Sequence, residues 1–200
     1  MSLADIVDNN RTDKNTVHSY LGLYEKLLRP RKETATHVLE IGIAYGGGSI
    51  KMWHDYFQNA TVYGLDVIPL HEISDDLKTF ERVRIHASTN AYDPAVIARE
   101  FVERGIFFDM VLDDGPHTLD SMRAFITHYS HLLKEDGILI LEDIQSWDWI
   151  ESLTNCVPSH LKGYVEVYDL RKNKRRYDDI VLVIDKSKPK SEYIPHYIPL

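Results

Sequence analysis

The chain has 200 residues, of which 44% are hydrophobic and 27% charged, so it is long enough for one hydrophobic core but short for two. Its 23 lysines and arginines against 31 aspartates and glutamates give a formal net charge of -8, which argues against nucleic acid as a partner. The only cysteine, Cys156, excludes an internal disulfide and a zinc cluster of several thiolates. The start, MSLADIVDNNRTDKN, has no signal-peptide pattern, and no apolar run is as long as a membrane span, so we expect a cytoplasmic protein without a membrane partner.

Apolar runs alternate with amphipathic stretches along most of the chain, which is typical of a sheet with helices on its faces. The pattern predicts a leading helix over residues 18–28. The strands predicted after it are 37–41, 61–65, 83–86, 107–112 and 138–141, and the helices are 49–57, 94–104 and 119–133. Two later strand-like runs, 164–170 and 180–184, are joined by the basic turn 171–176 and predict an antiparallel hairpin.

These elements predict an α/β fold, with a Rossmann-like, doubly wound and mostly parallel sheet and an antiparallel C-terminal hairpin at its edge. We interpret residues 1–200 as one domain, with a leading helical segment at 1–35, a core at 36–185 and an irregular tail at 186–200. In such a sheet, ligands bind beyond the carboxyl ends of the strands. The residues that follow each apolar run are therefore the candidates for a functional site.

The first predicted strand runs into a glycine-rich turn, Glu40-Ile41-Gly42-Ile43-Ala44-Tyr45-Gly46-Gly47-Gly48-Ser49. Glycines let a ligand approach the backbone closely, and the helix start that follows offers unpaired N–H groups. The turn lacks the Gly-Lys-Ser/Thr of a P-loop, and Ala44 stands where a dinucleotide motif has its second glycine. Asp66 closes the second strand, where it could accept hydrogen bonds from both hydroxyls of a ribose or serve only as a cap. Together these features resemble the S-adenosylmethionine site of class I methyltransferases.

Carboxylates gather after the fourth and fifth predicted strands, in Asp113-Asp114-Gly115-Pro116-His117 and in Glu142-Asp143. Four carboxylates side by side repel one another unless a hard cation such as Mg²⁺ neutralises them, although each acid alone could be a turn or cap residue. His117 follows a tight turn and is a plausible general base, because an unperturbed imidazole titrates near neutrality. Of the ten histidines, we single out His117 and His18.

The order of these motifs resembles the metal-dependent sugar O-methyltransferases that act on macrolide antibiotics, of the mycinamicin and macrocin type. The matching segments are Thr12-Asp13-Lys14, His18-Ser19-Tyr20 with Tyr24, Val38-Leu39-Glu40-Ile41-Gly42, Lys51-Met52-Trp53, Asp55-Tyr56-Phe57 and the two acidic segments. The resemblance implies that Asp114, Glu142 and Asp143 hold Mg²⁺, that His117 is the base, and that Glu40, Gly42, Asp66, Ser88 and Asp113 bind S-adenosylmethionine. The chain departs from the family pattern at Pro116, where serine is usual, and at Ser88-Thr89, where Asp-Gln is usual near the adenine.

We therefore expect an S-adenosylmethionine- and Mg²⁺-dependent O-methyltransferase that acts on a sugar hydroxyl of a glycan or of a glycosylated small molecule. A catechol has the same vicinal oxygens, so a phenolic acceptor is an alternative within this enzyme class. A nicotinamide-dependent oxidoreductase and a non-catalytic nucleoside-binding module are alternatives outside it, but both leave the second acidic pair unexplained. Formation of a homo-oligomer is left open.

Overall fold

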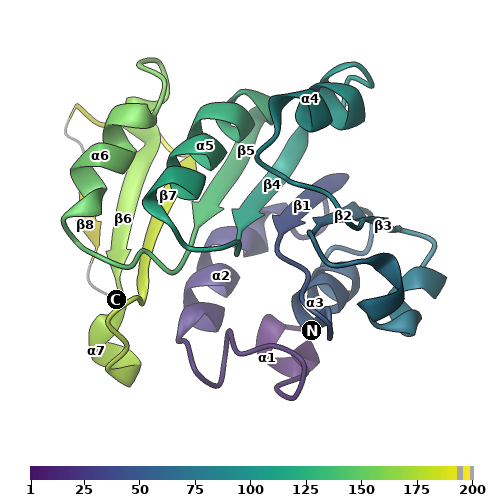
Figure 1. Ribbon diagram of the computed structural model, residues 1–200. Coiled ribbons are helices and arrows are strands. Elements are labelled where there is room, and N and C mark those ends of the chain that lie inside the picture. Colours follow the sequence, from purple (N-terminus) through teal and green to yellow (C-terminus); the bar gives the residue numbers. More distant parts are fainter. Residues whose placement is uncertain (193–195, 199–200) are drawn as a thin grey trace. The chain divides into compact units, whose positions relative to one another are not determined.

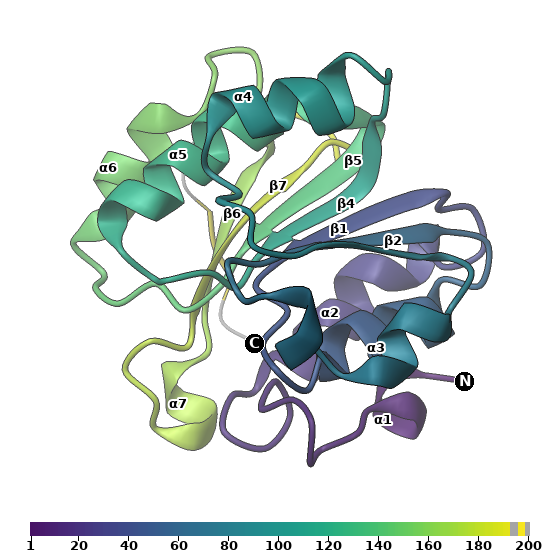
Figure 2. The same cartoon turned by 45° about the vertical axis from the view of Figure 1, so that its right-hand side comes forward.

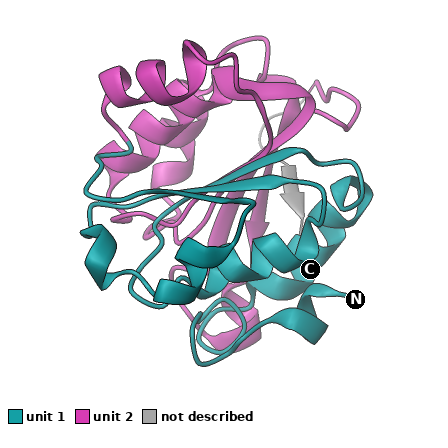
Figure 3. Ribbon diagram, turned by 90° about the vertical axis from the view of Figure 1, so that its right-hand side faces the viewer, with its two compact units in different colours: residues 1–91 teal, residues 92–200 magenta. Residues whose placement is uncertain are grey.

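The computed structural model describes residues 1–192 and 196–198, the last three as backbone only. The chain forms two compact units, Met1–Ala91 (unit 1) and Tyr92–Leu200 (unit 2) (Figure 3). The interpretation of residues 1–200 as one domain stays a prediction. Within the described part of the chain, no helix has both the length and the apolar character that crossing a membrane needs.

Unit 1 contains a parallel three-stranded sheet in the order β3-β2-β1, with pairs such as Val38 to Val62 and Val62 to Val83. Its elements are α1 (Leu3–Ile6), α2 (Tyr20–Leu28), η1 (Arg29–Arg31), β1 (His37–Ile41), α3 (Gly48–Tyr56), β2 (Thr61–Leu65), η2 (Leu70–Glu72), η3 (Asp75–Thr79) and β3 (Val83–His86). Helices α2 and α3 lie on the same face of this sheet (Figure 2). Their apolar sides are buried, including Tyr24 and Trp53, whose rings meet edge to face.

Unit 2 contains the strands β4, β5, β7, β6 and β8 in that order of pairing. Its elements are α4 (Pro94–Ile97), η4 (Ala98–Val102), β4 (Phe108–Asp113), α5 (Leu119–Tyr129), η5 (Ser130–Leu132), β5 (Leu133–Leu141), α6 (Trp149–Cys156), η6 (Lys162–Tyr164), β6 (Val165–Asp169), α7 (Arg171–Lys174), β7 (Ile180–Asp185) and β8 (His196–Ile198). Helices α4, α5 and α6 lie on one face of these strands (Figure 1). Strands β4 and β7 are buried along their whole length.

The direction of the strands places the candidate acids at one edge of the unit 2 sheet. Strands β4 and β5 are parallel, and Asp113 pairs with Leu141, so the residues after each strand leave the sheet side by side. Strands β5 and β6 are both antiparallel to β7, which confirms the predicted hairpin and sends the ends of β5 and β6 to the same edge. The segments after β4, β5 and β6 therefore converge at this edge.

Several elements differ from the sequence expectations. The predicted helix 94–104 consists of α4 followed by the π-helical turn η4, and the predicted helix 119–133 ends as α5 at Tyr129 with one 3-10 turn after it. Strand β5 begins at Leu133, because Lys134–Gly137 continue it through a register shift opposite β4 rather than forming a helix-closing turn. Helices α1, α6 and α7 were not predicted.

The tail also differs from the expectation of an irregular segment at 186–200. Within it, β8 runs parallel to β6 and pairs with it, so it covers an edge that would otherwise present unpaired N–H and C=O groups. Residues 193–195 and 199–200 of the predicted tail lie outside the described residues.

Candidate active site

The glycine-rich turn of unit 1 is closed by Asp66 at the end of β2. The Oδ2 atom of Asp66 accepts hydrogen bonds from the backbone N–H of Ile43 at 2.7 Å and of Ala44 at 2.9 Å. Its Oδ1 atom accepts a third hydrogen bond, from the N–H of Ile68 at 3.0 Å. A carboxylate has about four lone-pair sites, so these bonds leave capacity for about one further donor. Asp66 thus connects β2 to the turn after β1, in addition to any ligand it binds.

Gly42 and Ser88, the other two predicted cofactor residues near this turn, both have left-handed backbones. Gly42 has a φ of 90° and donates its N–H to the carbonyl of Leu65 at 2.9 Å. Ser88 is exposed, has a φ of 51°, and donates its N–H to the carbonyl of Ile68 at 2.9 Å. Gly42 and Ser88 thus bond to Leu65 and Ile68, which flank Asp66 in the sequence.

Glu40 lies in a different environment, with its side chain fully buried. Its Oε2 atom accepts a hydrogen bond from the indole Nε1 of Trp53 at 2.7 Å, and its Oε1 atom lies 3.3 Å from the ammonium of Lys14, which is 1% exposed. Direct contact of Glu40 with a cofactor stays a prediction. Sequence reasoning missed Lys14 as the partner of Glu40, although both residues stood in the motifs that carried the resemblance.

In unit 2, Asp114, His117 and Asp143 converge at the ends of β4 and β5. The Nε2 atom of His117 lies 3.6 Å from Oδ1 of Asp114 and 3.5 Å from Oδ2 of Asp143. The three residues offer ligand atoms that all lie within 4.8 Å of one another. The local sequence explains this geometry, because Asp114 leaves a buried strand and Thr118, one residue after His117, caps the next helix by accepting the N–H of Ser121.

Glu142, the third predicted metal ligand, is not part of this group of three. Its side chain is buried, and its N–H points to the carbonyl of Asp113 at 3.4 Å, so its backbone joins the ends of the two strands. The structure thus brings two of the three predicted ligands together with the predicted base and places Glu142 directly beside them in sequence. Its assignment as a metal ligand stays a prediction.

Asp113 is buried at the end of β4, with 3% exposure, and its Oδ1 atom accepts a hydrogen bond from the hydroxyl of Tyr92 at 2.6 Å. Burial raises the pKa of Asp113 to about 8, the hydrogen bond from Tyr92 opposes this rise, and the neighbouring charge of Asp114 adds to it. Burial also raises the pKa of Tyr92, with the Asp113 carboxylate adding to the effect. Tyr92 was not predicted, because nothing in the local pattern links it to a residue so far along the chain.

Left-handed backbone marks the predicted site segments. The non-glycine residues with positive φ among the described residues are Ala44, Ser88, His117, Asp143 and Arg175. Such conformations are uncommon outside glycine, are costly, and concentrate at functional sites. Four of these five residues belong to segments predicted as cofactor or metal sites, which supports those segments without assigning a role to any one residue.

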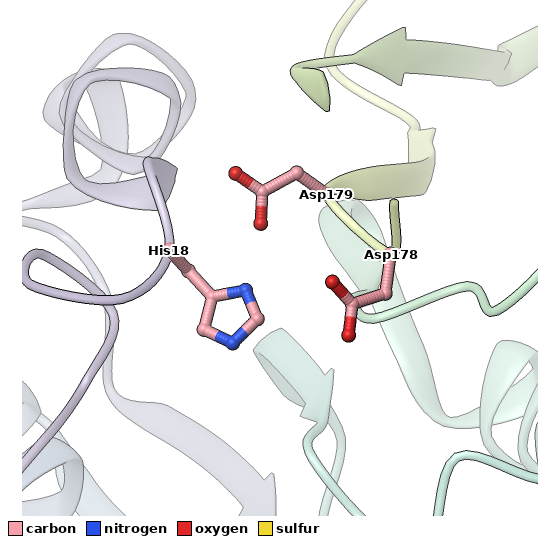
Figure 4. Close-up of side chains that lie close together, drawn as sticks. All are labelled: His18, Asp178 and Asp179. Carbon is pink, nitrogen blue, oxygen red and sulfur yellow. The ribbon is translucent and has the colours of Figure 1, made fainter. Parts of the chain in front are cut away.

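His18, the second histidine singled out from the sequence, lies just before α2 and is buried. Its ring stacks on Tyr20 with 4.9 Å between centroids, and its Nε2 atom lies 3.8 Å from Oδ2 of Asp13. Figure 4 also labels Asp178 and Asp179, two consecutive buried acids that directly precede β7. Sequence reasoning missed this pair, because it considered the residues that follow each apolar run and these two acids precede one.

No protein-family model matches the chain. A curated relative, the 8-demethyl-8-alpha-L-rhamnosyl tetracenomycin-C 2'-O-methyltransferase of Streptomyces olivaceus, is 32% identical over 155 residues, which cover 74% of this chain and 39% of that protein. The L-olivosyl-oleandolide 3-O-methyltransferase of Streptomyces antibioticus is 32% identical over 140 residues, which cover 66% of this chain and 34% of that protein. The chain thus spans well under half the length of these relatives.

Among solved structures, the MycE methyltransferase of the mycinamycin pathway, in complex with Mg, SAH and mycinamycin VI, matches 100% of this chain and 56% of that chain, with a TM-score of 0.72 and 20% identity. Another crystal form of MycE, with Mg and SAH, matches 72% of this chain and 37% of that chain, with a TM-score of 0.62 and 25% identity. These likenesses confirm the Rossmann-like fold class. With the curated relatives, they confirm the resemblance to macrolide sugar O-methyltransferases that the motifs indicated.

Proposed function

We propose that the chain transfers a methyl group from S-adenosylmethionine to a sugar hydroxyl in a Mg²⁺-dependent reaction. The observation that carries this proposal is the convergence of Asp114, His117 and Asp143 on one point at the ends of two parallel strands. Sugar O-methyltransferases among the relatives and the Mg and SAH named for MycE support it. The acceptor belongs to a glycan or to a glycosylated small molecule.

The residues of unit 2 fit a hard cation. Asp114 and Asp143 offer carboxylate oxygens, the ligands that Mg²⁺ prefers, and Asp143 has a left-handed backbone with a φ of 55°. The Nε2 atom of His117 lies 3.6 Å from Asp114 and 3.5 Å from Asp143, so the three groups surround a common point. Glu142 would complete an all-oxygen set in which Mg²⁺ keeps waters or acceptor oxygens.

His117 is the proposed base. When bound, S-adenosylmethionine would supply an electrophilic methyl group, and Mg²⁺ would lower the pKa of an acceptor hydroxyl. His117 would take the hydroxyl proton at Nε2, the atom that faces both carboxylates. Asp114 and Asp143 then stabilise the imidazolium that forms, which lowers the cost of holding the proton there.

In unit 1, Asp66 and the turn beside it would bind the cofactor. The remaining capacity of Asp66 suits one ribose hydroxyl better than two, because backbone N–H groups already occupy most of its lone pairs. Gly42 and Ser88 would let the cofactor approach the backbone closely, since their left-handed conformation turns the chain sharply at both positions.

Calorimetric titration of the chain with S-adenosylhomocysteine and, separately, with NAD tests the cofactor. Binding of S-adenosylhomocysteine alone is expected, whereas binding of NAD alone would favour an oxidoreductase. Incubation with methyl-labelled S-adenosylmethionine, Mg²⁺ and either methyl α-L-rhamnoside or catechol then tests the acceptor class by mass spectrometry. Label in catechol but not in the glycoside would overturn the sugar assignment.

The metal site is tested without turnover, with Mn²⁺ as a paramagnetic probe. The wild-type chain is expected to bind Mn²⁺ with Mg²⁺ as a competitor, and Asp143→Asn is expected to bind it at least tenfold more weakly, because a charged ligand is lost. The matched control is Asp120→Asn, at an almost fully exposed carboxylate at the start of α5. Equal Mn²⁺ affinity in both variants would show that the acids after β4 and β5 are structural.

A further inference from the structure

Arg11, in the segment before α2, holds the glycine-rich turn of unit 1 with its side chain. Its Nε and Nη2 atoms donate to the backbone carbonyl of Gly46 at 2.9 and 2.5 Å. Its Nη1 and Nη2 atoms donate to the two carboxylate oxygens of Asp76 at 2.6 and 3.0 Å. The guanidinium therefore joins the turn after β1 to the helix η3 through four hydrogen bonds.

The backbone of Arg11 also packs against this turn. A Cβ atom added to Gly48 would lie 2.5 Å from the carbonyl oxygen of Arg11, and one added to Gly46 would lie 3.3 Å from the same atom. Gly47, between them, has a φ of 55° and packs on Leu77 of η3, where a Cβ atom would lie 2.1 Å from a methyl carbon. A side chain at position 48 would overlap the backbone of Arg11, so the turn and the Arg11 segment are in direct backbone contact there.

Asp76 completes the connection on the side of η3. The hydroxyl of Ser74 donates to Oδ1 of Asp76 at 2.7 Å, and the N–H of Ser74 donates to the carbonyl of Tyr45 in the turn at 3.0 Å. The hydrogen bond from Arg11 lowers the pKa of Asp76 to about 2, so the carboxylate is charged at neutral pH. The turn is thus attached to η3 at two points, through Arg11 and through Ser74.

We propose that Arg11 is a positioning residue that, together with Asp76, fixes the glycine-rich turn in the conformation that binds S-adenosylmethionine. This inference rests on the proposed function. The turn contains left-handed residues, and a strained backbone persists only where its surroundings hold it. A planar guanidinium can bridge a carbonyl and a carboxylate at once, whereas a lysine ammonium is a point charge on a flexible stem. Arg11 therefore acts on the cofactor through Gly46 and not by touching it.

A purely structural role of Arg11 and a positioning role predict different effects of its substitution. The loss of a structural bridge lowers the free energy of unfolding but leaves the folded fraction with normal ligand affinity. The loss of a positioning residue weakens cofactor affinity even in chains that remain folded. The turn then adopts several conformations, and only the fraction in the binding conformation can bind the cofactor. Affinity corrected for the folded fraction separates the two.

The experiment is calorimetric titration of the 200-residue chain with S-adenosylhomocysteine in wild type, Arg11→Lys, Arg11→Ala and Asp76→Asn. The matched control is Asp75→Asn, which removes the adjacent carboxylate of η3. The side chain of Asp75 is 97% exposed and is paired with Lys78 at 2.7 Å. Thermal unfolding gives the folded fraction of each variant, and hydrogen exchange reports the amides of residues 43–48.

We expect Arg11→Ala and Asp76→Asn to bind roughly tenfold more weakly, within the range of about 10²-fold that small misplacements can cost. Arg11→Lys should fall between them and wild type, and Asp75→Asn should match wild type. Amide exchange at 43–48 should speed up in the weak binders. If wild type binds and the folded Arg11→Ala and Asp76→Asn variants bind equally well, Arg11 has no positioning role. If wild type does not bind S-adenosylhomocysteine, the proposed function itself is wrong, and this inference is wrong with it.

Discussion

The glycine-rich turn of unit 1 and the acidic turn of unit 2 both follow a buried strand and both contain left-handed residues, but different groups meet at each. In unit 1, protein groups bond directly to the turn, with Asp66 accepting its N–H groups and Arg11 donating to its carbonyl. In unit 2, Asp114 and Asp143 approach His117 only to 3.6 and 3.5 Å. The first turn is bound through its backbone N–H and carbonyl groups, whereas the second places ionisable side chains around a common point. This difference suits a large organic cofactor in one and a small cation in the other.

Removal of divalent metal should have the largest effect. It is expected to inactivate the acidic turn of unit 2 and to leave cofactor binding at the turn of unit 1 unchanged. Activity is expected to be abolished by EDTA and restored by Mg²⁺, since the oxygen ligands of unit 2 suit a hard cation. Affinity for S-adenosylhomocysteine is expected to survive chelation, because the bonds of the unit 1 turn involve no metal. Normal turnover by the metal-free protein would show that the acidic turn does not work as a cation site.

Substitution of the proposed base should have the next largest effect. His117→Ala is expected to lower kcat by about 10² to 10⁴, while cofactor affinity and Tm stay near wild type. His131→Ala, at an exposed histidine of the same unit, serves as the control. Turnover above about a tenth of wild type with saturating substrate, or a large loss of Tm, would assign His117 to packing.

Loss of the buried ion pair between Lys14 and Glu40 should lower stability. Lys14→Met leaves the buried carboxylate of Glu40 without its cation, which typically costs about 3 to 5 kcal/mol of unfolding free energy. Chemical denaturation measures this loss, with Lys26→Met on the exposed side of α2 as the control. The double variant Lys14→Met, Glu40→Gln should recover much of the loss, because no lone charge remains. Equal stability of Lys14→Met and Lys26→Met would show that the buried ion pair does not stabilise the fold.

The buried carboxylate of Asp113 is expected to make stability depend on pH. Its pKa is about 8 in the folded chain and about 3.9 in an unfolded one, so the folded state binds more protons between these values. Its contribution to stability is therefore fully present below about pH 4 and is lost as the pH rises through about 8. Asp113→Asn should lack this loss in denaturant titrations with EDTA from pH 4 to 9.

Tyr92→Phe provides the complementary measurement. It removes the hydrogen bond that opposes the rise in the pKa of Asp113, so the loss of stability should move to higher pH. A difference between wild type and Asp113→Asn that does not change with pH would contradict the buried, proton-binding carboxylate.

How well the sequence predicted each feature depended on the range of the interactions behind it. Strands β1, β2 and β3 fall at their predicted bounds, because short apolar runs with polar ends mark buried strands locally. The meeting of Asp114 with Asp143 followed from strand direction, since parallel strands end at one edge. The start of β5 was missed because Lys134–Gly137 have the composition of a turn, and only their pairing with β4 makes them strand.

The supporting residues could not be predicted. Lys14, Tyr92 and Arg11 act through contacts with residues 21 to 65 positions away in the sequence. A local pattern carries no record of such pairings, because a lysine or arginine in a polar segment usually faces solvent. The sequence therefore indicated where polar groups gather, and the fold was needed to show what holds them.

The close packing of Gly115 against Tyr92 constrains which residues can replace either of them during evolution. A Cβ atom at this position would lie 2.0 Å from the hydroxyl oxygen of Tyr92, the atom that donates to Asp113. Any larger residue at 115 must displace that hydroxyl, so its effect depends on which residue occupies position 92. Positions 92 and 115 are therefore expected to covary among related proteins. Alanine at 115 is expected mainly where phenylalanine or a shorter side chain has replaced the tyrosine at 92.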